Sequence, residues 1–168
     1  MHKTDLGGVR LAIAGDAGVE SAFNEIMATV AANAPSANLD GVLVAPMVRG
    51  GVECILGAHI DPVFGPVVMF GLGGVFVEVL KDVSFRLAPI DVEEARSMVA
   101  EIRGAALLSG VRGAEPSDIQ ALCRAIAALS EFANANRERL LSVDVNPFVV
   151  LPEGSGCIAL DAVVVSRT

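Results

Sequence analysis

The sequence of 168 residues has no tryptophan and no tyrosine, and basic side chains are few. Lysine and arginine number 12 against 20 aspartates and glutamates, which gives a formal net charge of -8 and an isoelectric point near 4.7. A nucleic-acid surface needs a basic patch that displaces phosphate counterions, so we expect no nucleic-acid partner. Any phosphate group that this protein binds must be neutralised locally.

Paired cysteines and a membrane-spanning run are also missing. The three cysteines, Cys54, Cys123 and Cys157, are widely spaced, form no CxxC pair and follow no secretory signal. This pattern predicts buried, reduced thiols in a cytoplasmic protein. The longest apolar run, 63–77, is interrupted by glycine and proline and is shorter than the roughly 20 residues of a membrane helix. We therefore expect no membrane partner.

The sequence is rich in small and branched apolar residues: 53% are hydrophobic and only 19% are charged, a balance typical of α/β interiors. Its length suits one core or two small lobes. Apolar periodicity predicts an α+β fold in two layers, in which an antiparallel sheet packs against helices. Strands are expected over 9–14, 41–48, 53–60, 67–70, 75–80, 143–151 and 157–165, and helices over 16–32, 91–104 and 117–136. Asp16, Asp91 and either Ser117 or Asp118 are the expected helix caps.

The last two apolar runs predict a β-hairpin, because the segment between them contains proline and two glycines. Alternation along the first strand places Asp144 and Asn146 on one face, and Val143 and Pro147 on the other. Folding the hairpin then sets Asp161 opposite Asn146, where cross-strand Cβ atoms are about 5 Å apart.

Two carboxylates and a carboxamide at this separation suit a hard cation. Mg²⁺ in particular takes a few protein oxygens and keeps positions for water and phosphate oxygens. The alternative is that 144–147 is a turn and Asp161 is a solvent-exposed strand residue. Three oxygen ligands without cysteine or histidine do not decide between these two interpretations.

The glycine-rich segment 71–74 is not a dinucleotide-binding loop, because that motif needs a following helix and 75–80 alternates like a strand. A plain tight turn fits, and so does a turn whose backbone amides approach a ligand phosphate. Glu78 is the only charged residue of the run 75–80. It is either a partly buried carboxylate that requires a partner or function, or an edge residue that faces water.

Five motifs occur in a fixed order along the whole chain. They are His2-Lys3-Thr4-Asp5 with Gly7-Gly8, Met47-Val48 with Gly50-Gly51-Val52-Glu53, Asp61-Pro62-x-Phe64-Gly65-Pro66, Phe70-Gly71-x-Gly73-Gly74 with Glu78, and Asp144-x-Asn146-Pro147 with Asp161. This series resembles the ATP-grasp domain of NDP-forming acyl-CoA synthetases. These include ADP-forming acetate–CoA ligases, and the β subunit of succinyl-CoA synthetase is a more distant relative.

The resemblance implies roles for particular residues. Mg²⁺ bound to the phosphates of ATP or ADP would be surrounded by Asp144, Asn146 and Asp161. The nucleotide would contact Ala45, Pro46, Met47 and Val48 at a hinge, Glu53 near the ribose or phosphates, and Gly73 and Gly74 at the site of phosphoryl exchange. The catalytic residues implied are His2, which would carry the phosphoryl group, and Glu78.

The resemblance also implies an activity. The full enzyme interconverts acid, CoA and ATP with acyl-CoA, ADP and phosphate through acyl phosphate and phosphohistidine. Its expected partners are CoA-binding and ligase domains, in the same chain or in a separate subunit, together with the acyl acid and CoA, in an oligomer.

Two departures from the family pattern qualify this interpretation. Val163 stands where many relatives have a basic residue, and the first part of the ATP-grasp lid, with its nucleotide-binding lysine, has no counterpart. We therefore interpret 1–48 as the remnant of an amino-terminal subdomain and 49–168 as the carboxy-terminal subdomain, a fragment expected to be inactive alone. The alternative function is a non-catalytic, ligand-sensing ATP-grasp module, as in proteins fused to an acetyltransferase.

Overall fold

The computed structural model describes residues 6–74, 81–111 and 113–167. These residues belong to two compact units, Met1–Arg49 and Gly50–Thr168. Helices and an antiparallel sheet make up the regular structure, so the predicted α+β class is confirmed.

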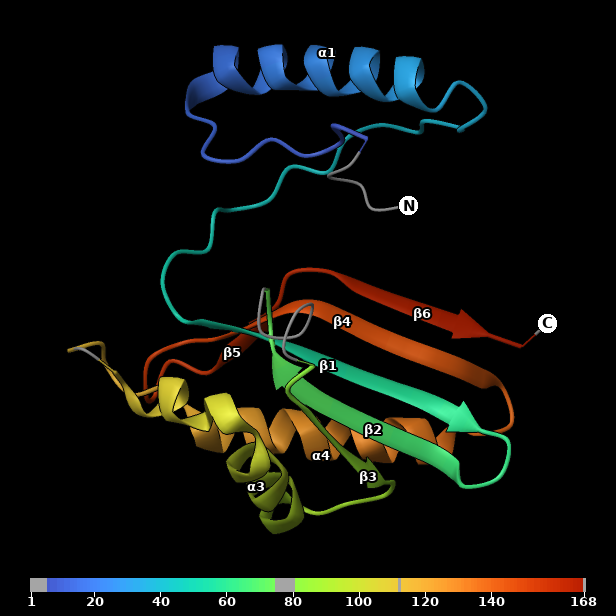
Figure 1. Ribbon diagram of the computed structural model, residues 1–168. Helices are drawn as coiled ribbons and strands as arrows, with labels where there is room; N and C mark the ends of the chain where they lie inside the picture. The colour runs from blue at the N-terminus through green and yellow to red at the C-terminus, as the bar shows by residue number, and fades with distance from the viewer. Residues whose placement is uncertain (1–5, 75–80, 112, 168) are drawn as a thin grey trace. The chain divides into compact units, whose positions relative to one another are not determined.

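The first unit contains one long helix, α1 (Gly15–Asn33), shown in Figure 1. The buried residues of this helix recur at helical spacing and are Ala22, Ile26 and Val30. Phe23 was expected on the same buried face, but its side chain is 44% exposed. The described residues of this unit thus bury only part of the predicted apolar stripe.

Three local predictions for this unit are wrong. The helix begins before Asp16, and the residue at the cap position is Ala14, so no side chain caps the helix. The segments 9–14 and 41–48 form no strand, because no partner strand in the described part of the unit takes up their backbone hydrogen bonds. Ala12 also has a positive φ of 56°, which interrupts an extended run.

The described residues of the second unit are organised around a six-stranded antiparallel sheet. Its strands are β1 (Val52–Asp61), β2 (Gly65–Leu72), β3 (Val83–Leu87), β4 (Leu140–Val150), β5 (Cys157–Ala159) and β6 (Ala162–Ser166). The order is β3-β2-β1-β4-β5, and β4 is long enough to pair with β6 as well. The predicted hairpin turn between β1 and β2 and the later hairpin are confirmed. Strand β3 was not predicted, and the strand predicted at 75–80 lies outside the described residues.

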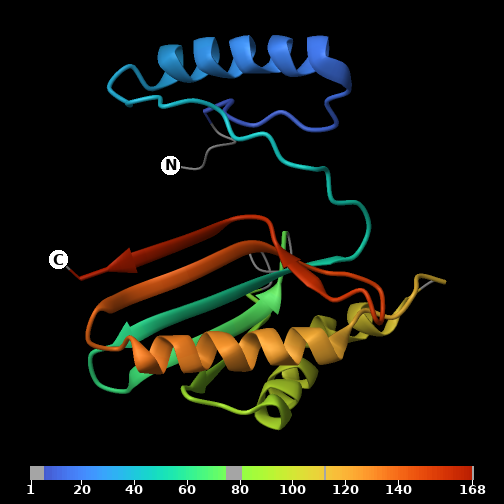
Figure 2. The same cartoon turned by 180° about the vertical axis from the view of Figure 1, so that it is seen from behind.

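Two α-helices, α3 (Val92–Glu101) and α4 (Ile119–Ala135), cover one face of this sheet, as Figures 1 and 2 show from opposite sides. The predicted cap at Asp91 is confirmed: its side chain accepts a hydrogen bond from the Glu94 amide at 2.8 Å. The peptide bonds that precede Pro89 and Pro147 are cis.

The helix expected over 91–104 is shorter than predicted. The α-helix ends at Glu101, and a 3-10 helix, η1 (Arg103–Ser109), follows. The buried carboxylate of Asp82 accepts the backbone amides of Arg103 at 2.9 Å and Gly104 at 2.8 Å. These two bonds satisfy amides at the start of η1 and explain why a new helical turn begins there.

Alternate residues of β1 form the centre of the core between sheet and helices. Cys54, Leu56 and Ala58 are buried against the helices, with partners that include Phe70 on β2 and Leu122 on α4. Burying one side chain of leucine or phenylalanine size stabilises the fold by about 1.5–3 kcal/mol. No helix within the described ranges combines the length and the apolarity needed to cross a membrane.

Candidate functional site

The register of the carboxy-terminal hairpin brings Asn146 and Asp161 together. Val145 pairs with Ala162, and Phe148 pairs with Ala159, so the residues between them keep the same alignment. The Asn146 amide donates to the Asp161 carbonyl oxygen at 3.1 Å. The predicted cross-strand placement of these two residues is therefore confirmed.

A β-bulge lies at the same point of β4. Cys54 pairs with Phe148 and Leu56 pairs with Val145, so Ile55 alone lies opposite both Asn146 and Pro147. The predicted alternation through 143–147 therefore breaks down after Asn146, because the bulge adds a residue on this strand. Bulges change the direction of a side chain relative to its neighbours, and this one is adjacent to the candidate metal ligand Asn146.

Asp144 and Asn146 lie on β4, and Asp161 lies in the short link between β5 and β6. The side chains of Asp144 and Asn146 are exposed, and that of Asp161 is half-buried. Asp144 pairs with Gly57 on β1 and with Val163 on β6. Neither of these two directly opposite residues carries a charge.

These residues fit a magnesium site that uses few protein ligands. Within the described parts of the chain, no three histidine, cysteine, aspartate or glutamate side chains lie close enough to hold a metal. The candidate set is of a different kind, since Asn146 supplies a carboxamide oxygen beside the carboxylates of Asp144 and Asp161. Mg²⁺ tolerates such a sparse set because it keeps several waters and binds substrate phosphates.

Glu53 and Gly73, which were both expected near the nucleotide, are in direct contact. Glu53 is exposed on β1, next to the buried Cys54, and therefore faces away from α3 and α4. Gly73 follows β2, and its amide donates to the Glu53 carbonyl oxygen at 2.7 Å. A Cβ atom on Gly73 would lie 3.1 Å from the carbonyl carbon and from the Cβ of Glu53. Only glycine allows this approach without displacing Glu53.

The other predicted site residues are Gly74, the run 45–48, His2 and Glu78. Gly74 has a φ of 63°, which favours glycine, and open space around its Cβ position. The run Ala45, Pro46, Met47 and Val48 belongs to the first unit and has no regular structure. The catalytic candidates His2 and Glu78 lie outside the described residues.

One residue, Asp118, has a structural role that the sequence did not reveal. It was expected as a cap of α4, and its Oδ1 accepts the Ala121 amide at 2.9 Å. Its Oδ2 also accepts the amides of Gly154 at 3.1 Å and Gly156 at 3.0 Å, in the turn of the carboxy-terminal hairpin. The backbone donors of Ala121 and Gly156 hold the pKa of Asp118 below its ordinary value. The sequence signal for this role is weak: an aspartate at a helix start and two glycines in a turn far along the chain.

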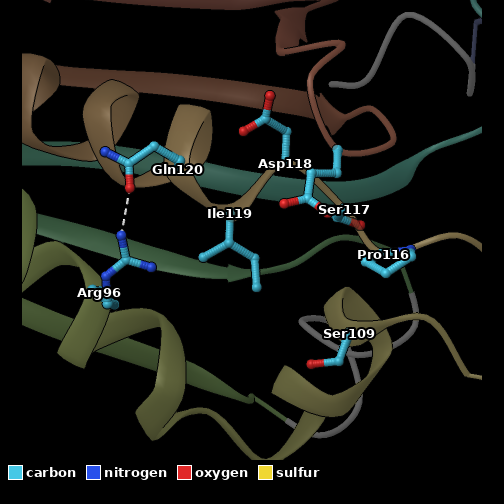
Figure 3. Close-up of a pocket in the computed structure, with 8 residues that line it drawn as sticks. Arg96, Ser109, Pro116, Ser117, Asp118, Ile119 and Gln120 are labelled. Carbon is cyan, nitrogen blue, oxygen red and sulfur yellow. Dashed lines mark hydrogen bonds between the residues drawn. The ribbon is translucent and has the colours of Figure 1, made fainter.

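A shallow cavity of about 430 Å³ lies beside the start of α4. In Figure 3 the guanidinium of Arg96 on α3 reaches Gln120 on α4, while the Asp118 side chain points away from this pair. Residues that line the cavity include one basic residue, Arg96, and two acidic ones, Asp118 and Glu153, so its lining carries no excess of positive charge for a phosphate group. Glu53, Gly73 and Gly74, the candidate nucleotide residues of the second unit, do not line this cavity.

Comparison with known proteins identifies the family. A model of the ATP-grasp domain matches residues 1–165. The chain belongs to the ATP-grasp family. The β subunit of acetate–CoA ligase (ADP-forming) II from Pyrococcus furiosus is 39% identical over 167 residues, which cover 99% of this chain and 71% of that subunit. The 4-hydroxybutyrate–CoA ligase (ADP-forming) of Nitrosopumilus maritimus is 45% identical over 161 residues, which cover 96% of this chain and 23% of that ligase.

Solved structures agree with these sequence matches. Acetyl-coenzyme A synthetase 1 of Ca. Korarchaeum cryptofilum, in complex with coenzyme A, Ca-AMPCP and HgCl+, aligns with a TM-score of 0.93 at 41% identity. The alignment covers 98% of this ATP-grasp chain and 70% of that chain. A second structure of the same synthetase holds coenzyme A and Mg-AMPPCP and aligns with a TM-score of 0.80. The ATP-grasp chain thus spans about 70% of a separate relative subunit and about a quarter of the single-chain ligases.

Proposed function

We propose that this chain is the nucleotide-binding, magnesium-binding and phosphoryl-transferring part of an ADP-forming acyl-CoA synthetase. The observation that supports the proposal is the hairpin register, in which the backbone amide of Asn146 bonds to the backbone carbonyl of Asp161, so that these two residues are cross-strand neighbours. The similarity to ADP-forming ligases over almost the whole chain supports the same conclusion. The relative synthetase that holds Mg-AMPPCP supports ATP or ADP with Mg²⁺ as the ligands.

Under this proposal Asp144, Asn146 and Asp161 hold Mg²⁺, which neutralises phosphate charge when it is bound. Glu53 lies near the ribose or phosphates, Gly73 and Gly74 line the place where the phosphoryl group is exchanged, and the segment 45–48 holds the adenine. The direct contact between Glu53 and Gly73 supports placing these two at one site. Phosphoryl transfer of this kind depends mainly on positioning and electrostatics, which these residues supply.

The catalytic roles proposed for His2 and Glu78 come from their motifs. His2 would accept and release the phosphoryl group, and Glu78 would line the place where the group is exchanged. We further propose that the whole enzyme includes CoA-binding and ligase domains, in the same chain or another subunit, and that it acts as a cytoplasmic oligomer on an acyl acid and CoA. The subunit and single-chain ligases among the relatives support both arrangements.

Calorimetric titration of ADP, with and without Mg²⁺, tests the proposed metal site. In Asn146→Ala and Asp161→Asn we expect the Mg²⁺-dependent gain in ADP affinity to fall at least tenfold, roughly 1.4 kcal/mol. Glu138→Gln is a matched control, because it removes one negative charge from an exposed residue outside the site. A loss in Glu138→Gln as large as that in Asp161→Asn would show a general charge effect and contradict the role of Asp161 as a ligand, and an unchanged gain in Asn146→Ala would contradict the role of Asn146.

The same titration distinguishes an enzyme part from a ligand-sensing module. A sensing module predicts nucleotide binding that needs neither Mg²⁺ nor Asn146. An enzyme part predicts Mg²⁺-dependent binding, together with transfer of label from γ-³²P-ATP to the protein that is lost in His2→Asn. Nucleotide binding without either property would contradict the proposed function.

A further inference from the structure

We propose that Asp118 is a positioning residue for the candidate metal site, because it holds the hairpin turn (residues 151–156) and thereby keeps Asp161 opposite Asn146. This inference rests on the proposed function, since it assigns Asp118 to the site formed by Asn146 and Asp161. Asp118 itself is not a metal ligand, because its two oxygens accept backbone amides from α4 and from the hairpin turn.

The hairpin turn is fastened to the segment before α4 by several independent contacts. The Asp118 carboxylate accepts the amides of Gly154 and Gly156, and the Asp118 amide donates to the Leu151 carbonyl oxygen at 2.8 Å. The Glu153 amide donates to the carbonyl oxygen of Pro116 at 2.8 Å. Ser117 and Pro152 form an isolated β-bridge between the same two segments. The turn is therefore held from outside the hairpin at both of its ends.

Among these contacts, the two hydrogen bonds to the Asp118 carboxylate are made by a side chain, and the others are made by the backbone. Gly154 and Gly156 have φ values of 79° and 80°, so both sit in the left-handed region. Their amides point to a single oxygen of Asp118, which is 8% exposed. Hydrogen bonds to a charged acceptor are stronger than neutral ones, and a partly buried amide without an acceptor is costly. Asp118 thus selects the turn conformation that the glycines permit.

The segment between the turn and β6, which contains β5 and Asp161, depends on the turn for its register, whereas β6 has five pairs with β4 of its own. Strand β5 has only three residues, Cys157–Ala159, and so supplies few pairing contacts of its own. A shift of one residue would move Asp161 away from Asn146 and reverse the faces of all following side chains. The next contacts after β5 are the Leu160 amide to the Pro147 carbonyl oxygen at 2.9 Å and the Asn146 amide to the Asp161 carbonyl oxygen at 3.1 Å. These two bonds report directly on the register at the candidate site.

Two substitutions separate this role from helix capping. Asp118→Ser keeps a good helix cap, but its side chain is too short to reach the turn as well. Asp118→Asn keeps one oxygen, which serves the helix or the turn but not both. Asp91→Asn is the matched control, because Asp91 caps α3 through the Glu94 amide and makes no hydrogen bond to the hairpin.

The experiment uses two measurements on the whole protein. Amide hydrogen exchange at Asn146 and Leu160 reports the hairpin register, and calorimetry of ADP with and without Mg²⁺ reports the site. In Asp118→Ser and Asp118→Asn we expect both amides to exchange at least tenfold faster, while those of β2 stay unchanged. We expect the Mg²⁺-dependent gain in ADP affinity to fall at least fivefold, with metal-free ADP affinity and the Asp91→Asn protein unchanged.

Hydrogen exchange and calorimetry together distinguish a failure of the positioning role from a failure of the proposed function. Unchanged exchange at Asn146 and Leu160 in both Asp118 variants would overturn the positioning role, whatever the protein binds. Faster exchange with an unchanged gain from Mg²⁺ would overturn it too, because Asp118 would then be only a structural residue. A wild-type protein without Mg²⁺-dependent ADP binding would refute the proposed function and, with it, the assignment of Asp118 to a metal site.

Discussion

Gly73 and Glu53 are joined by a 2.7 Å hydrogen bond from the glycine amide to the glutamate carbonyl oxygen. A Cβ atom added to Gly73 would lie 3.1 Å from the carbonyl carbon and from the Cβ of Glu53. Gly73 follows β2 and Glu53 lies near the start of β1, so this contact fixes the end of one strand against the beginning of its neighbour. Both residues belong to sequence motifs assigned to the nucleotide. The contact explains why glycine suits the first of these two positions, because any larger residue would press on Glu53.

Gly73→Ala tests that contact. We expect it to lower the free energy of unfolding by about 1–2 kcal/mol, because an added methyl group in a filled space forces its neighbours apart. We also expect weaker ADP binding, because the atoms that must move belong to Glu53. Urea denaturation and calorimetry measure the two effects.

The control for this substitution is Gly113→Ala. Gly113 has a φ of 86° with open space around its Cβ position, so alanine there introduces backbone strain without displacing a neighbour. We expect a comparable loss of stability, about 1 kcal/mol, and no change in ADP affinity. If Gly73→Ala leaves ADP affinity at the value of the Gly113→Ala protein, the assignment of Glu53 to the nucleotide is wrong.

The sequence predicts the hairpin well because its signals are local. The apolar runs and the turn residues lie within 25 positions, and they are enough to set Asp161 opposite Asn146. The bulge at Asn146 and Pro147 could not be predicted, because it arises from pairing with Ile55 on β1, a strand that is far away in the sequence. In the same way, the sequence predicted Asp118 as a helix cap, but its hydrogen bonds to Gly154 and Gly156 depend on a tertiary contact that the sequence does not show.

The segments 9–14 and 41–48 illustrate the opposite error. Each has the apolar composition of a strand, yet neither is one in the structure. A strand is defined by hydrogen bonds to a neighbour, and composition carries no information on whether a neighbour is present. Strand β3 was missed for a related reason: Ser84 and Arg86 on its helix-facing side break the apolar pattern, yet they bond to α3.

Acid should remove the stabilising effect of Asp118. Backbone donors, first Ala121 and then Gly156, lower its pKa in the folded protein from the ordinary 3.8. A carboxyl with a lowered folded pKa contributes stability above its unfolded pKa, and this contribution is lost as the pH falls through the folded pKa. We therefore expect the difference in unfolding free energy between wild type and Asp118→Asn to be constant above about pH 5 and to shrink below about pH 4.

Urea denaturation as a function of pH measures that difference. Asp61 also has a lowered pKa, because its side chain accepts the Phe64 and Val63 amides, but it is present in both proteins and cancels. A difference that stays constant down to pH 3 would show that the Asp118 carboxylate makes no charge-dependent contribution to the fold.

The three cysteines should differ sharply in reactivity. Burial raises the pKa of Cys54 to about 12, with smaller contributions from Cys157 and Glu53, and its side chain is fully buried. At neutral pH its thiolate fraction is then roughly a thousandfold below that of an ordinary thiol of pKa 9.0. We expect iodoacetamide to label the half-buried Cys157 first and Cys54 only on unfolding, as followed by mass spectrometry. Equal labelling rates in the folded protein would contradict the packing of β1 against the helices.

Val163→Lys tests whether Asp144 takes part in metal binding. Val163 pairs with Asp144 across β4 and β6 and is 54% exposed, so a lysine there places a cation beside the carboxylate without being buried. Opposite charges in such a pair attract by roughly 0.2–1 kcal/mol, and the lysine would compete with Mg²⁺ for Asp144. We expect metal-free ADP to bind more tightly and the gain in affinity from Mg²⁺ to fall about two- to fivefold.

Val164→Lys provides the control within the same strand. Val164 is 57% exposed and adds the same charge, but it pairs with Val143, whose side chain lies on the opposite face from Asp144. A general electrostatic effect on the nucleotide would appear in both lysine variants, whereas a ligand role for Asp144 requires the effect to be confined to position 163. If calorimetry finds the same Mg²⁺ dependence in both, Asp144 is not a ligand, and the site reduces to Asn146 and Asp161.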